Sequence, residues 1–176
     1  MPSTGTYATA FYGCTGLETV ALPDGLTEIA ARAFSGCSKL VSVRLPSTLT
    51  SIGEYAFYDC KALADVVVPE KITTLSRSLF AGCTGLKSVT IPAGVKTIDS
   101  GAFNKCSALE SIELPEGLTT LGSQAFMNCS ALKSVRIPDG VTAIPNETFA
   151  YCSVLETVEL PSALKTIGNM AVSYTH

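Results

Sequence analysis

Residues 102–124 read AFNKCSALESIELPEGLTTLGSQ, and the next segment, residues 125–147, reads AFMNCSALKSVRIPDGVTAIPNE. The two segments share their phenylalanine, cysteine, leucine and proline at identical positions, 23 residues apart and without a gap. All seven cysteines keep this interval, at Cys14, Cys37, Cys60, Cys83, Cys106, Cys129 and Cys152. All seven phenylalanines, from Phe11 to Phe149, and seven of the nine prolines, from Pro23 to Pro161, keep it as well. A fixed period of roughly 20 to 50 residues is typical of solenoids, propellers and arrays. Because nothing interrupts the count, we expect uniform stacked coils.

Each repeat predicts a short strand followed by turns. A leucine stands three residues after every cysteine, and a Val-x-Leu type alternation follows before the proline. This period of two indicates a strand with both aliphatic side chains pointing inward. Proline then ends the strand because it cannot donate a ladder hydrogen bond, and Pro-Asp-Gly sequences favour a type I turn. The segment 53–57, Gly-Glu-Tyr-Ala-Phe, predicts a single helical or 3₁₀ turn on the opposite side of the coil.

These residues carry a family resemblance. The pattern Leu-x-x-Val-x-Leu resembles the strand of leucine-rich repeats, and Ala-Phe-x-x-Cys with Leu-Pro is similar to the BspA-like (Treponema-type) subfamily. The match runs from about Ala10 to Ile167, although proline stands where common leucine-rich repeats have an asparagine ladder. The resemblance implies a curved solenoid with a parallel sheet on its concave face and short helical or 3₁₀ turns on its convex side. It also implies a cell-surface or secreted protein used for adhesion. We predict one such domain over residues 1–176, with about seven repeats and incomplete repeats at both ends.

Composition and charge exclude several classes of function. A net charge of -3 argues against nucleic-acid binding, which needs a basic field. The apolar runs are a few residues long, so we expect no membrane insertion. The first residues, MPSTGTYATA, show no signal peptide, so a surface location rests on the resemblance alone. The single histidine is His176, and no phosphate-binding loop or activated serine is visible, so we predict no enzyme and no cofactor.

The cysteine row is predicted to be core. Stacked neighbours would meet the Cα separation of a disulfide, but their Cβ vectors run parallel, and the number of cysteines is odd. No Cys-x-x-Cys pair exists to bind zinc. Free cysteine packs as a small apolar side chain, so we predict reduced, buried thiols.

The outward positions of the strands predict where a partner binds. In the N-terminal half they combine small apolar side chains with isolated polar ones. The candidate partner-binding residues are Ala21, Val41, Arg44, Ala64, Asp65, Val67 and Thr90. In the C-terminal half the charges alternate along two rows, Lys87, Glu110, Lys133 and Glu156 beside Glu113, Arg136 and Glu159. There we expect cross-strand ion pairs, worth about 0.2–1 kcal/mol each.

Three further features have simpler interpretations. The threonine row from Thr27 to Thr142 suggests an ice-binding face, but Lys96 interrupts it, and threonine favours exposed strands. The glycosylation patterns at Asn128 and Asn146 are interpreted as chance matches in turns. At the ends, Ser3 and Thr6 stand where repeats have aliphatic residues, and Val172 and Thr175 stand where an eighth repeat would have its phenylalanine and cysteine. We therefore expect that the chain is part of a longer array, or that its ends associate with another copy.

The residues and the resemblance together predict a non-catalytic protein-binding or adhesion module. Its partner would be a protein, such as a host-matrix or cell-surface protein, bound by the concave sheet. The alternative is a structural spacer or stalk segment of a larger surface protein.

Overall fold

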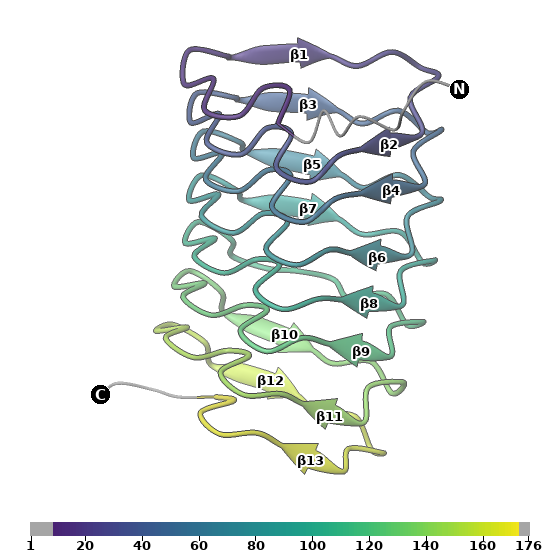
Figure 1. The fold of residues 1–176 in the computed structure, drawn as a ribbon. Helices are drawn as coiled ribbons and strands as arrows, with labels where there is room; N and C mark the ends of the chain where they lie inside the picture. The colour runs from purple at the N-terminus through teal and green to yellow at the C-terminus, as the bar shows by residue number, and fades with distance from the viewer. Residues whose placement is uncertain (1–8, 173–176) are drawn as a thin grey trace.

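The computed structural model describes residues 9–172, which wind into a stack of parallel coils (Figure 1). We number the coils 1 to 7 by the cysteine that each contains, from Cys14 to Cys152. The first row of strands is β1 (Thr19–Ala21), β3 (Ser42–Arg44), β5 (Asp65–Val67), β7 (Ser88–Thr90), β10 (Ser134–Arg136) and β12 (Thr157–Glu159). The second row is β2 (Glu28–Ile29), β4 (Ser51–Ile52), β6 (Thr74–Leu75), β8 (Thr97–Ile98), β9 (Thr120–Leu121), β11 (Ala143–Ile144) and β13 (Thr166–Ile167). The predicted parallel-strand solenoid with 23-residue repeats is confirmed.

The first row follows the alternation read from the sequence. In β3, Val43 is buried while the two residues flanking it are exposed. Strands in neighbouring coils pair in parallel with an offset of one repeat, so that Val20 lies opposite Val43 and Val66 lies opposite Val89. One face of each strand therefore joins the core, and the other forms the outer surface that we call the strand face.

The hydrogen-bonded ladder of the strand face is interrupted twice. β1 pairs with β3 and β5 pairs with β7, but β3 and β5 are not paired. In coil 5 no full strand forms, and Ser111 makes a single bridge to Ser134 of β10. At the end of the strand, the N–H of Val68 donates to Thr90 at 3.0 Å, whereas no corresponding bond among residues 9–172 joins Leu45 to Val67. The strand face thus consists of paired blocks separated by two openings.

The second row is also divided, and at one division the cause is local. The N–H of Gly122 donates to Ile98 at 2.7 Å and links coils 4 and 5. The equivalent residue one coil later is Pro145, which has no N–H to donate to Leu121. β9 and β11 accordingly belong to separate sheets.

The segments expected to form helical or 3₁₀ turns form β-turns instead, and residues 9–172 contain no helix. Two positions in each repeat have positive φ, such as Arg32 (60°) and Gly36 (79°), and a right-handed helix requires negative φ throughout. Backbone N–H groups alternate in direction: Phe34 donates to Ala56 of the next coil at 2.9 Å, and Ser35 donates back to Arg32 at 3.1 Å. The left-handed rows are Arg32, Tyr55, Ser78, Gly101, Gln124, Glu147 and Met170, and Gly13, Gly36, Asp59, Gly82, Lys105, Asn128 and Tyr151.

Stacked side chains of equal type fill the core. The phenylalanine rings of successive coils lie nearly parallel, with centroids from 5.1 Å apart for Phe11 and Phe34 to 5.7 Å apart for Phe57 and Phe80. Apart from Phe11, which is 37% exposed, every ring in this row is buried. The repeat of identical residues thus becomes a continuous aromatic stack.

The cysteine row is buried from Cys37 to Cys152, as predicted. Each of these thiols donates a hydrogen bond of 3.1–3.2 Å to the carbonyl oxygen of the phenylalanine in the preceding coil. Each of these carbonyl oxygens also accepts a hydrogen bond from the backbone N–H of the cysteine in the carbonyl's own coil. The thiol therefore donates to the second lone pair of that oxygen. The prediction was wrong for Cys14, which is exposed because no described coil covers it.

The structure describes one of the four end residues singled out in the sequence, Val172. Val172 stands where the next phenylalanine would be and is half-buried, whereas Ser3, Thr6 and Thr175 lie outside the described residues. In coil 7 the aliphatic side chains Leu160 and Ile167 are 50% and 59% exposed. Their equivalents in coil 6, Ile137 and Ile144, are buried by the coil that follows.

Candidate interaction surface

The seven candidate residues lie on the strand face of coils 1 to 4. Six of them are exposed, including Val41 at 49% and Val67 at 64%, while Ala64 is half-buried. The structure brings Arg44, Asp65 and Val67 together around one opening. The other four, Ala21, Val41, Ala64 and Thr90, lie on neighbouring parts of the same face and do not line that opening. Their binding role stays a prediction.

The opening lies where β3 and β5 fail to pair, and its volume is about 550 Å³. Arg44 at the end of β3 and Asp65 at the start of β5 supply opposite charges, and the exposed Val67 supplies an apolar wall. Glu70 lines the opening from the turn after the strand. We call this the β3–β5 opening.

Sequence reasoning missed the part of this opening that comes from the strand exits. Leu45, Ser47, Val68, Pro69 and Glu70 also line it. The proline repeat marks those positions as turns, which would have placed them beside the strand ends. No pattern in the sequence indicates that β3 and β5 separate.

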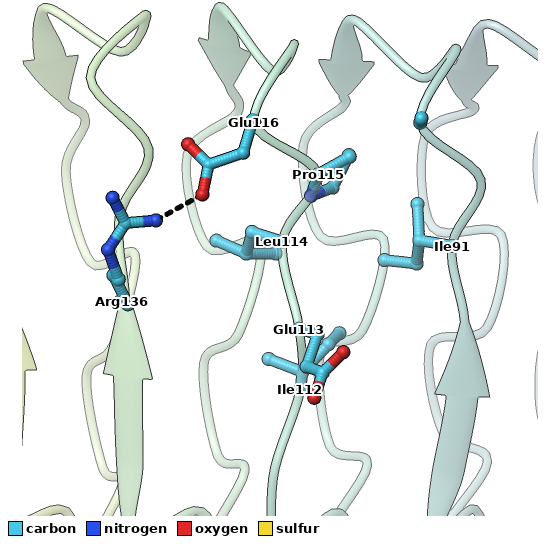
Figure 2. Close-up of a pocket in the computed structure, with 8 residues that line it drawn as sticks. Ile91, Ile112, Glu113, Leu114, Pro115, Glu116 and Arg136 are labelled. Atoms are coloured by element: carbon cyan, nitrogen blue, oxygen red, sulfur yellow. Dashed lines mark hydrogen bonds and ion pairs between the residues drawn. The ribbon is translucent and has the colours of Figure 1, made fainter.

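A second opening, of about 410 Å³, lies between coils 4 and 5, where coil 5 has no full first-row strand (Figure 2). Ile91, Ile112 and Leu114 give it apolar walls. Figure 2 shows Arg136 reaching from the end of β10 to the carboxylate of Glu116, to which its guanidinium is hydrogen-bonded. Arg136 also lies 3.9 Å from the carboxylate of Glu159. The positive charge of Arg136 is therefore already matched within the molecule, whereas Glu113, which also lines this opening, forms no ion pair with a described residue.

Some of the ion pairs predicted for the charged rows of the C-terminal half are present. Lys133 Nζ lies 3.1 Å from the carboxylate of Glu110, and Arg136 is paired with Glu159 as expected. Three members of these rows, Lys87, Glu113 and Glu156, form no ion pair with a described residue. All paired side chains are more than half exposed, so each pair contributes about 0–1 kcal/mol.

The buried thiols are poor candidates for nucleophiles or metal ligands. Burial raises the pKa of Cys60 to about 12 and that of Cys152 to about 11. It raises the pKa of Cys83, Cys106 and Cys129 well above the ordinary value. The thiolate is the reactive form of cysteine, so these side chains stay protonated and inert near neutral pH. Within residues 9–172, no group of three or more His, Cys, Asp and Glu side chains could hold a metal ion.

Comparison with known proteins places the chain in a family. The family model described as BspA type leucine rich repeat region (6 copies) matches residues 4–107 and 73–176. Among solved structures, a leucine-rich repeat protein from Bacteroides ovatus is similar with a TM-score of 0.73 and 30% identity, over 88% of this chain and 49% of that chain. A leucine rich cell surface protein from Faecalibacterium prausnitzii is similar with a TM-score of 0.67 and 28% identity, over 90% of this chain and 52% of that chain.

The leucine-rich repeat protein of T. pallidum is similar with a TM-score of 0.61 and 31% identity, over 91% of this chain and 64% of that chain. The chain thus spans between 49% and 64% of the length of these three proteins. A search of curated proteins found no match. Among the described residues, none forms a helix of the length and apolarity needed to cross a bilayer. The repeat pattern, the stacked coils and the family match over the length of the chain agree: this chain belongs to the BspA-type leucine-rich repeat family.

Proposed function

We propose that this chain is a non-catalytic protein-binding or adhesion module that contacts its partner through the strand face. One observation carries the proposal: the β3–β5 opening is lined by the exposed apolar side chain of Val67 and by charged side chains. These charged side chains form no ion pairs with other described residues. The buried rows of phenylalanine, cysteine and the leucine three residues after it keep one residue type from coil to coil, while the exposed row changes from Ala21 to Arg44, Val67 and Thr90. A solenoid commonly binds through such an extended face.

The proposed location is the cell surface or the extracellular medium, and the proposed partner is a host-matrix or cell-surface protein. The description of the similar F. prausnitzii protein as a cell surface protein supports this location. It does not identify a partner.

The test is capture of matrix and cell-surface proteins on the immobilised chain. The double variant Val41→Glu/Val67→Glu places two charges on the strand face. The matched control Thr74→Glu/Thr120→Glu places two charges on exposed positions of the second row. We expect the first variant to lose capture and the control to keep it. Equal capture by both variants would contradict binding through the strand face.

The second candidate function is a spacer that holds another domain away from a surface. The uniform repeat favours it, because no coil carries an insertion that would make it distinct. With strands spaced about 4.8 Å apart, seven coils extend the chain by roughly 30 Å. A spacer tolerates charges on either row and captures no protein across a broad panel, which is the outcome that separates it from a binding module.

A further inference from the structure

Two arginines occupy the same place in the repeat, four coils apart. Arg44 ends β3 in coil 2, and Arg136 ends β10 in coil 6. Arg136 is held by two carboxylates, Glu116 from the preceding coil and Glu159 from the following coil. Arg136 therefore shows that carboxylates pair with an arginine at this position of the repeat.

The corresponding carboxylates are missing or shortened around Arg44. The repeat places Val67 where coil 7 has Glu159, and Asp24 where coil 5 has Glu116. Aspartate is one methylene shorter than glutamate. Arg44 accordingly forms no ion pair with any residue of 9–172, and Val67 is 64% exposed.

The space for an external group is present at the same place. β10 and β12 pair along Ser134–Arg136, so Glu159 is carried there by a strand of the chain. β3 and β5 do not pair, and the β3–β5 opening of about 550 Å³ lies between them. Arg44 and Val67 both line this opening.

We propose that the β3–β5 opening binds an extended peptide segment of the partner through one carboxylate, which occupies the position at Arg44 that Glu159 occupies at Arg136. An aliphatic side chain beside that carboxylate covers Val67. Asp65 and Glu70 line the same opening, so a run of acidic residues is repelled and a single acidic residue is preferred. This inference rests on the proposed protein-binding function and specifies what the partner presents.

The test uses fluorescein-labelled, C-terminally amidated peptides of the sequence Thr-Val-Xaa-Leu-Thr-Gly, whose first four positions follow residues 157–160. Xaa is glutamate, glutamine or lysine, and a fourth peptide carries three consecutive glutamates. Binding is measured by fluorescence polarisation. A hydrogen bond to a charged group contributes enough that the glutamate peptide should bind about tenfold more tightly than the glutamine peptide. The triple-glutamate peptide should bind more weakly than the single-glutamate peptide.

Three variants assign the effect to Arg44. Arg44→Gln should remove the preference for glutamate. Val67→Glu should remove it too, because it supplies an internal carboxylate in the arrangement seen at Arg136. The matched control Arg136→Gln removes the same charge from the same repeat position and should leave the preference unchanged.

The inference is overturned if the glutamate and glutamine peptides bind the unaltered chain equally, or if Arg136→Gln acts as Arg44→Gln does. It is also overturned if no peptide binds. The protein-capture experiment is decided separately: capture that depends on the strand face but not on Arg44 keeps the proposed function and removes this inference.

Discussion

Replacement of Phe103 by alanine perturbs the middle of the aromatic stack. The Phe103 ring is fully buried and lies between two others, with its centroid 5.6 Å from that of Phe80 and 5.3 Å from that of Phe126. Phe11 provides a matched control because it occupies the same repeat position, is 37% exposed and has one stacking neighbour, Phe34, at 5.1 Å.

The magnitude follows from burial and from the number of stacked neighbours. Removal of a buried phenylalanine costs about 3–5 kcal/mol, because it loses apolar burial and leaves a cavity. Each aromatic pair adds about 0.5–1.5 kcal/mol, so two lost pairs place Phe103→Ala in the upper part of that range. Phe11→Ala loses one pair and a partly exposed ring, so we expect about 1–2 kcal/mol. For a domain of this size, Phe103→Ala should lower Tm by roughly 8–20 °C.

Guanidinium unfolding followed by far-UV circular dichroism measures both variants against the unaltered chain. Phe103→Leu keeps an apolar side chain and removes the aromatic contacts, so it should fall between the unaltered chain and Phe103→Ala. The reasoning is refuted if Phe103→Ala costs less than about 1 kcal/mol, or no more than Phe11→Ala. Either result would mean that the coils do not depend on the stack.

Three further predictions concern the thiols and the left-handed turns. Ellman's reagent should label Cys14 in the folded chain and the other cysteines only after denaturation, because Cys14 alone among the described cysteines is exposed. Rapid labelling of several thiols in the folded chain would contradict this prediction. The folded-state pKa values of about 12 for Cys60 and about 11 for Cys152 exceed the ordinary 9.0, so the unfolded chain loses these protons first. The contribution of these two thiols to stability is complete below pH 9 and falls as the pH rises toward those values. Between pH 8 and 10.5, the midpoint of guanidinium unfolding should therefore drop less in a Cys60→Ala/Cys152→Ala variant than in the unaltered chain. An equal drop in both proteins would oppose this explanation. Lys105 has a φ of 64°, so Lys105→Gly should raise the free energy of unfolding by about 0.5–1 kcal/mol. The control Lys61→Gly replaces a residue without positive φ and should lower the free energy of unfolding. Destabilisation by both substitutions would show that glycine relieves no strain at Lys105.

The candidate site was predictable in three of its residues but not in its shape. The exposed positions Arg44, Asp65 and Val67 follow from the strand alternation, and the replacement of Glu159 by Val67 in the earlier coil can be read by counting repeats. The β3–β5 opening could not be predicted, because coils with the same pattern pair normally at β5 and β7.

The sequence by itself determined the coil length, the buried rows and the strand register, because one residue type repeated every 23 positions can be buried in every coil only if the coils stack in register. Only the tertiary structure decided the turns. A segment such as 53–57 reads as a helical turn in isolation, yet Tyr55 adopts a φ of 57°. Its N–H donates to Arg77 of the next coil at 3.0 Å, a bond that an isolated segment does not have. The exposure of Cys14 has the same origin, since the burial of each row depends on the coil beside it.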